Sequence, residues 1–207
     1  MISAVLWDFG GVISTSPFDG FAAYERENGL PVGFIRGLNA TNPHTNAWAA
    51  FERGSVDLDG FASLFEEEAR LAGGTVDARV LIEGLRGSVI PEMAEAVRIC
   101  HRFFKTGLLT NNFRAGDRAN DHGGLLDEFD VIVESSLAGC RKPDPRFYLM
   151  ACEQLDIHPS EAVFLDDLGV NLKPARQLGM TTIKVVDHDQ ALADLEAVTG
   201  LELRSAA

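Results

Sequence analysis

Polar side chains that could bind a metal ion or an anion follow four short apolar runs in this sequence. Directly after three of these runs stand Asp8, then Thr110 with Asn111, then Asp166 with Asp167. Lys142 lies a short loop beyond the fourth run. Mg²⁺ prefers oxygen ligands and often combines one or two carboxylates with waters and a phosphate. The set therefore favours a site that holds an anion against a hard divalent cation.

These residue types could carry phosphoryl transfer. A carboxylate such as Asp8 can attack phosphorus when a metal and nearby donors neutralise the repulsion between two anions. Thr110 and Asn111 could donate hydrogen bonds to the nonbridging oxygens, and Lys142 would add positive charge where negative charge accumulates. The Gly10-Gly11 pair would let the backbone turn sharply and aim a carbonyl at the metal.

Five apolar runs are expected to be strands, at residues 4–7, 107–109, 131–133, 162–165 and 182–186. Helix-period segments lie between most of them, including residues 91–104 and 144–155, which predicts a parallel, doubly wound α/β sheet. The carboxyl ends of its strands would form the ligand crevice and bring the polar groups together. The helix at 144–155 is expected to bury Phe147, Leu149, Met150 and Leu155.

Residues 15–88 contain no convincing strand. Helical patterns dominate there, at residues 18–27, 32–38, 46–53, 57–72 and 76–85, with Asp57 placed to cap the fourth. We therefore expect a core made of residues 1–14 and 89–207, with residues 15–88 inserted as a helical cap.

Composition narrows the function classes. The 207 residues carry a formal net charge of −13 and only four lysines, so general nucleic-acid binding is not expected. No stretch approaches the roughly 18 apolar residues of a membrane span, and no basic leader precedes Asp8. The three cysteines lack close paired spacing and are expected to be reduced. We expect a cytoplasmic protein.

Four segments, in order, resemble the haloacid dehalogenase-like superfamily. They are Trp7-Asp8-Phe9-Gly10-Gly11-Val12-Ile13, Leu108-Leu109-Thr110-Asn111-Asn112, Arg141-Lys142-Pro143-Asp144-Pro145 and Phe164-Leu165-Asp166-Asp167-Leu168-Gly169-Val170-Asn171. The third and fourth look especially similar to the phosphatase-type N-terminal domain of soluble epoxide hydrolases. The resemblance implies a Rossmannoid three-layer core with a mainly parallel sheet and a helical cap inserted after the first strand.

The resemblance also implies a role for each polar residue. Asp8 would be the nucleophile, and Lys142 would stabilise both it and the phosphate. The phosphate would be bound by Thr110 and Asn111. The ligands of Mg²⁺ would be Asp8, the Gly10 carbonyl and Asp167, while Asp166 would orient the site. The substrate would be a small phosphorylated metabolite.

Position 10 departs from the family pattern. Phosphatases of this family normally have an aspartate there, which protonates the leaving oxygen and then activates water, whereas this chain has Gly10. General acid–base catalysis is typically worth about 10² to 10⁴ in rate, so turnover is expected to be slow.

Alternatives remain open at this stage. Glycine at position 10 would also suit a catalytically silent protein that binds a phosphometabolite, and a 2-haloacid dehalogenase needs no second aspartate, although Asp166-Asp167 argues against it. Taken singly, Asp8 is typical of a strand-end turn and Lys142 of a solvated loop. Four arginines could meet a substrate anion or simply face solvent: Arg36, Arg53, Arg114 and Arg118. An exposed apolar face on the cap leaves a homodimer open.

Overall fold

The structure, a computed structural model, describes residues 1–85, 87–112 and 122–204. A five-stranded sheet, with every neighbouring pair parallel, lies at its centre in the order β3-β2-β1-β4-β5. The strands are β1 (Ala4–Trp7), β2 (Lys105–Thr110), β3 (Val131–Glu134), β4 (Ala162–Asp166) and β5 (Thr181–Lys184). The predicted α/β class with a mainly parallel sheet is confirmed.

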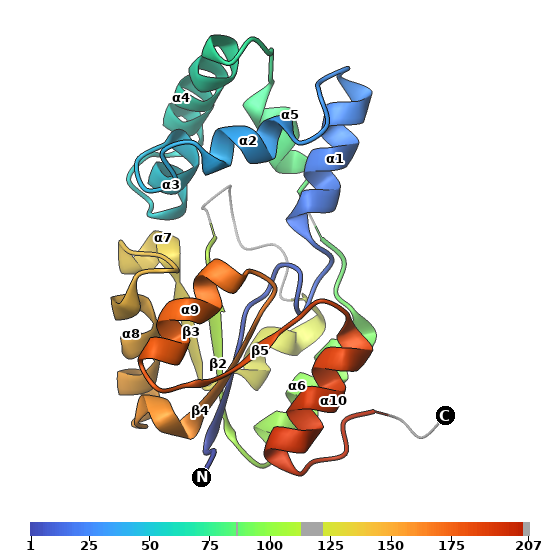
Figure 1. Ribbon diagram of the computed structural model, residues 1–207, viewed down its shortest axis with the longest axis vertical. Helices are drawn as coiled ribbons and strands as arrows, with labels where there is room; N and C mark the ends of the chain where they lie inside the picture. Colours follow the sequence, from blue (N-terminus) through green and yellow to red (C-terminus); the bar gives the residue numbers. More distant parts are fainter. Residues whose placement is uncertain (86, 113–121, 205–207) are drawn as a thin grey trace.

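Helices cover both faces of the sheet (Figure 1). On one face pack α6 (Pro91–His101), the 3₁₀ helix η1 (His122–Glu128) and α10 (His188–Thr199). On the other pack α8 (Pro145–Leu155) and α9 (Gly169–Gln177), with the short α7 (Ser135–Ala138) and η2 (Pro159–Glu161) in the connections. Alternate residues of β1 enter the two cores, since Val5 and Trp7 face one layer while Ala4 and Leu6 face the other. The result is a three-layer core.

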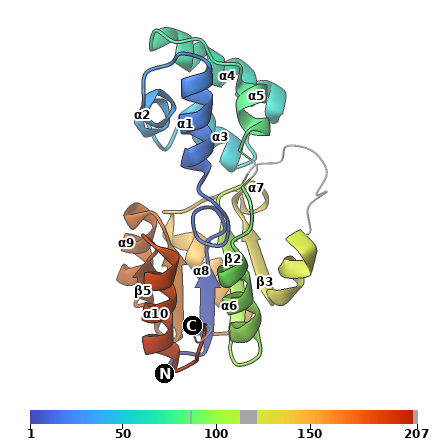
Figure 2. The same ribbon diagram turned by 90° about the vertical axis from the view of Figure 1, so that its right-hand side faces the viewer.

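In the described part of the chain between β1 and α6, five helices pack around an apolar core of their own. They are α1 (Pro17–Glu27), α2 (Phe34–Ala40), α3 (Ala47–Glu52), α4 (Leu58–Leu71) and α5 (Ala78–Glu83). Asp57 caps α4, as its position predicts, by accepting a hydrogen bond from Gly60 N at 2.8 Å. Figures 1 and 2 both show this cap on the side of the sheet where β1 and β2 end.

The chain leaves for the cap and returns from it along adjacent paths. Thr15 N donates to Ser88 O at 2.9 Å, Ile90 N donates to Ile13 O at 2.9 Å, and Ser14 bridges Val89 in antiparallel fashion. The two connections therefore form a short ladder beside the end of β1.

Two expectations from the sequence are wrong in detail. The last strand ends at Lys184 and does not reach residue 186, because its partner β4 ends at Asp166, which pairs with Lys184. Leu149 is 42% exposed. Successive helical residues turn by about 100°, so Leu149 lies on the far side from Phe147 and Ala151, which contact the sheet. Among the described residues, no helix has the length and apolar character needed to span a membrane.

Candidate active site

The strand order places Asp8 and Asp166 on neighbouring strands. From β1 the chain builds β2 and β3 on one side, and then crosses to β4 and β5 on the other. The winding therefore reverses between β1 and β4, where ligands typically bind in open α/β sheets. Asp8 directly follows β1, and its amide donates to Leu165 O on β4 at 2.9 Å. Asp166 is the last residue of β4.

Three carboxylates meet at this point. One oxygen each from Asp8, Asp166 and Asp167 can be chosen so that all three lie within 4.8 Å of one another. Asp8 and Asp166 are buried, and Asp167 is half-buried. Like charges at such spacing repel strongly in a poorly hydrated site, so the cluster requires positive charge nearby.

Lys142 supplies part of that charge. Its Nζ lies 2.8 Å from Asp8 Oδ1 and 2.8 Å from Asp166 Oδ2, and the side chain is only 1% exposed. A single ammonium thus bridges two of the three acids and holds the carboxylate of Asp8 at the end of β1. The sequence predicted that these residues would converge, and the structure brings them together.

Asp166 is fully engaged by the protein. Its Oδ1 accepts from Leu168 N at 2.8 Å and from Asn171 Nδ2 at 3.0 Å, while Oδ2 accepts from Lys142 Nζ. The sequence alone does not predict this role for Asn171. Its position in the first turn of α9, five residues after Asp166, is the signal that could have identified it.

Burial and neighbouring charges shift the pKa values of Asp8, Asp167 and Lys142. Burial raises the pKa of Asp8, Lys142 opposes the rise and Asp166 adds to it, leaving the pKa well above the ordinary aspartate value. Burial and the charge of Asp166 raise the pKa of Asp167 to about 6. Burial lowers the pKa of Lys142, but the attraction of Asp166 and Asp8 outweighs it and the pKa is raised. The ammonium therefore remains charged at neutral pH.

The donor set fits a hard divalent cation. Burial is the main cause that raises the pKa values of Asp8 and Asp167, and the negative charge of Asp166 adds to it, so a cation bound between these carboxylates would stabilise their charged forms. The Gly10-Gly11 turn lies against the same group. Gly11 has φ +76°, and a Cβ there would come 2.6 Å from Asp167 Oδ2, so only glycine lets the backbone approach the carboxylate this closely.

Thr110 and Asn111 lie on the other side of β1. Thr110 ends β2, the strand beside β1. The Asn111 side chain makes a contact that the sequence did not predict: its Oδ1 accepts from Lys142 N at 2.9 Å, and its Nδ2 donates to Lys142 O at 3.1 Å. Asn111 therefore fixes the backbone that carries the ammonium.

The arginines that could meet a substrate have other partners where they are described. Arg36 stacks over the Phe18 ring with its guanidinium carbon 4.4 Å from the ring centroid, and Arg53 donates to His44 O at 2.9 Å. Arg114 and Arg118 lie outside the described residues. The three cysteines are free and buried, as expected.

Comparison of the sequence with known proteins shows a family and several relatives. The model of the haloacid dehalogenase-like hydrolase family matches residues 2–179. The chain is 34% identical over 209 residues to acyl-CoA dehydrogenase family member 10 of Mus musculus, and 32% identical over 219 residues to bifunctional epoxide hydrolase 2 of Sus scrofa. These alignments cover 97% and 98% of this chain but only 19% and 40% of the relatives. The chain thus spans less than half the length of either protein.

A third relative is similar over most of its length. Phosphatase MT3486 of Mycobacterium tuberculosis (strain CDC 1551 / Oshkosh) is 30% identical over 203 residues, which cover 86% of this chain and 85% of that protein.

Solved structures share the fold. A HAD-like family hydrolase from Porphyromonas gingivalis superposes with a TM-score of 0.72 at 18% identity, covering 98% of this chain and all of that one. A HAD family enzyme from Bacteroides thetaiotaomicron, in complex with magnesium and inorganic phosphate, gives a TM-score of 0.62 at 17% identity over 89% of this chain and 94% of its own.

Proposed function

This chain belongs to the haloacid dehalogenase-like hydrolases, and we propose that it hydrolyses small phosphate monoesters with Mg²⁺ through an aspartyl-phosphate on Asp8. The observation that carries the proposal is the convergence of Asp8, Lys142 and Asp167 at the reversal point of the sheet. Phosphatase MT3486 and the magnesium and phosphate complex of the bacterial enzyme support it.

Asp8 is the nucleophile in this proposal. A carboxylate oxygen forms a bond to phosphorus while the bond from phosphorus to the ester oxygen breaks, and the leaving alcohol takes its proton from water because Gly10 has no acid to give. Lys142 holds the Asp8 carboxylate in place and offsets negative charge on the phosphoryl group. Water then attacks the phosphorus and frees Asp8.

The remaining residues bind and orient. Asp8, the Gly10 carbonyl and Asp167 would hold Mg²⁺, which supplies charge neutralisation for the two anions that must approach each other. Asp166 supports the site, since its oxygens are already engaged by Lys142, Leu168 and Asn171.

Phosphate oxygens would be bound on the β2 side of the nucleophile. Thr110 would contribute its hydroxyl. Because the Asn111 side chain is occupied by the Lys142 backbone, Asn111 would contribute its backbone N–H to the phosphate.

A second candidate function rests on Gly10. Without an acid at this position, the chain could retain phosphate and metal binding and have lost turnover, which would make it a binding or regulatory protein for a phosphometabolite. Tight calorimetric binding of a phosphometabolite in the presence of Mg²⁺, without phosphate release, would select this function.

The test is a magnesium-supplemented screen of phosphorylated metabolites that measures inorganic phosphate release. We expect slow release from a subset of substrates, lost on chelation. Asp8→Asn must abolish the signal while the protein keeps its fold by circular dichroism. Release that persists in Asp8→Asn, or none from any substrate, would overturn the proposal.

A further inference from the structure

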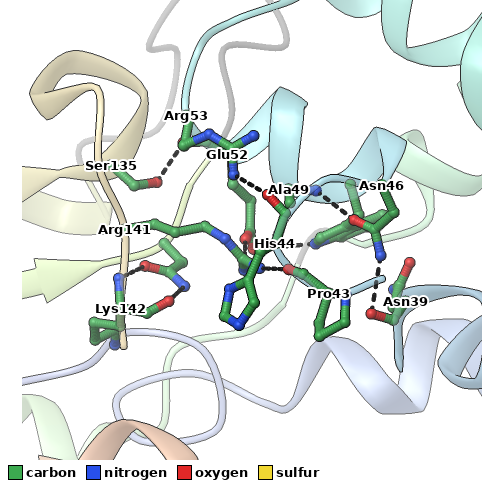
Figure 3. Close-up of polar contacts among 12 residues, drawn as sticks. Asn39, Pro43, His44, Asn46, Ala49, Glu52, Arg53, Ser135, Arg141 and Lys142 are labelled. Carbon is green, nitrogen blue, oxygen red and sulfur yellow. Dashed lines mark hydrogen bonds and ion pairs between the residues drawn. The ribbon is translucent and has the colours of Figure 1, made fainter. Parts of the chain in front are cut away.

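The cap contacts the core through an ion pair that lies beside the candidate site. Glu52 at the end of α3 receives a hydrogen bond on Oε2 from Arg141 Nη1 at 2.5 Å (Figure 3). The Arg141 side chain is 17% exposed and that of Glu52 11%. Arg141 Nη2 also donates to Pro43 O, so the guanidinium holds two points of the cap.

Backbone contacts accompany the ion pair. Ser135 Oγ donates to Glu52 O at 2.6 Å, and Ser135 is fully buried. Gly54, with φ +66°, lies so close to α7 that a Cβ would come 2.5 Å from Ser136 O. We call these contacts between residues 52–54 and residues 135–141 the α3–α7 seam.

The core residues of the α3–α7 seam are connected to residues of the candidate site through the backbone and through hydrogen bonds. Arg141 directly precedes Lys142, whose backbone is held by Asn111. Ser135 Oγ also accepts from Asn112 N at 3.0 Å, in the segment that follows Thr110 and Asn111. The seam is thus linked to Lys142 by one peptide bond and to the segment after β2 by one hydrogen bond.

The charged groups of Glu52 and Arg141 are both largely buried and neutralise each other. Trp48 Nε1 donates to the second Glu52 oxygen at 3.0 Å, so both carboxylate oxygens have a donor. Burial raises the pKa of Glu52, and Arg141 opposes the rise. A partly buried charge left alone costs far more than an exposed one, so separating the pair is unfavourable unless water or another charge replaces the lost partner.

We propose that Glu52 and Arg141 are positioning residues whose ion pair seats the cap on the core and thereby fixes Lys142 against Asp8. This inference rests on the proposed function for its kinetic consequence, but the seating of the cap does not depend on it. Neither residue contacts Asp8 in any described hydrogen bond or ion pair, so both act through Lys142.

The test compares three single variants and one double variant. Glu52→Gln keeps the shape and the acceptor for Trp48 but removes the charge, Arg141→Met removes the guanidinium, and Arg141→Lys keeps a positive charge. We expect Glu52→Gln and Arg141→Met each to lower kcat by about tenfold, on the scale of coupling between two sites, with a smaller change in KM. Arg141→Lys should recover most of the loss.

The double variant Glu52→Gln/Arg141→Met should lose no more than either single variant, because the two side chains act as a unit. The matched control is Asp59→Asn, which breaks the exposed pair of Asp59 with Arg79 at 2.6 Å within the cap and should leave kcat unchanged.

A second readout needs no turnover. Amide hydrogen exchange, measured with Mg²⁺ and inorganic phosphate present, should be faster in residues 47–54 and 135–142 of Glu52→Gln and Arg141→Met than in the wild type, and unchanged in β4. Unchanged exchange at the seam would overturn the inference, as would faster exchange with an unaltered kcat. If the wild type releases no phosphate, the proposed function fails, and exchange at the seam alone decides whether the pair seats the cap.

Discussion

Lys142 and Asp8 come from distant parts of the chain, yet Nζ and Oδ1 lie 2.8 Å apart in the interior of the protein. The same ammonium contacts Asp166 at 2.8 Å. Part of the positive charge that the three acids need therefore comes from the protein itself, and we propose that a cation supplies the rest.

Replacing Lys142 should destabilise the fold in a pH-dependent way. Lys142→Met leaves buried acids without their partner, and breaking a buried pair typically costs about 3–5 kcal/mol. In the folded variant the buried acids take up protons at a higher pH than they do in the unfolded chain. The loss of stability relative to the wild type should therefore shrink as pH falls. Urea unfolding at pH 8 and pH 5 measures this, and an equal loss at both values would contradict it.

Magnesium should stabilise the protein more at high pH. Because burial and Asp166 raise the pKa of Asp167 to about 6, and the pKa of Asp8 is raised as well, the acids hold protons at pH 5 that a cation must displace. At pH 8 and a hundredfold excess over Kd, binding adds about 2.7 kcal/mol to the free energy of unfolding. Thermal unfolding with and without Mg²⁺ should show a larger rise in Tm at pH 8 than at pH 5.

The control for this experiment is Asp167→Asn, which removes one proposed ligand and should abolish the rise in Tm. A rise of the same size in that variant would place the cation elsewhere.

Gly10→Asp should increase turnover by supplying the missing acid, by about 10² to 10⁴ at most. Gly10 lies outside the left-handed backbone region, and a Cβ there would meet Pro17 Cδ at 3.3 Å, so a small shift of the proline ring admits the side chain. Steady-state phosphate release measures the effect. No gain in a folded variant would mean that the missing acid does not limit the rate.

The same change one residue later is the matched control. Gly11→Asp must adopt φ +76° and place its Cβ 2.6 Å from Asp167 Oδ2. Gly11→Asp should lower the free energy of unfolding and abolish the rise in Tm with Mg²⁺. Gly10→Asp should keep the wild-type stability and the rise in Tm with Mg²⁺.

Asn171 should affect stability and turnover because it holds the Asp166 carboxylate. Its Nδ2 lies 3.0 and 3.1 Å from the two Asp166 oxygens. Asn171→Leu removes a donor from a buried carboxylate, which should lower the free energy of unfolding by about 1–3 kcal/mol. Phosphate release should fall as well, since Asp166 then holds Lys142 less firmly. Wild-type kinetics in this variant would show that Asp166 needs no support from α9.

The predictable features are those set by local pattern. The buried strands appear as apolar runs, and Asp8 and Asp166 could be placed because each stands where such a run ends. The exposure of Leu149 does not follow from the local pattern, because α8 has more apolar residues than one face can bury. The contact of Asn111 with Lys142 and the pair of Glu52 with Arg141 leave no local signal, since only the folded chain brings their partners together.

The ladder formed by Thr15 with Ser88 and Ile13 with Ile90 has an architectural consequence. We propose that residues 15–88 are a modular unit, because the chain departs and rejoins at hydrogen-bonded neighbours. A tight turn could join those neighbours without disturbing the sheet. A different insertion could therefore replace residues 15–88 at the same two points of the core, provided that it again held Arg141 in place beside Lys142.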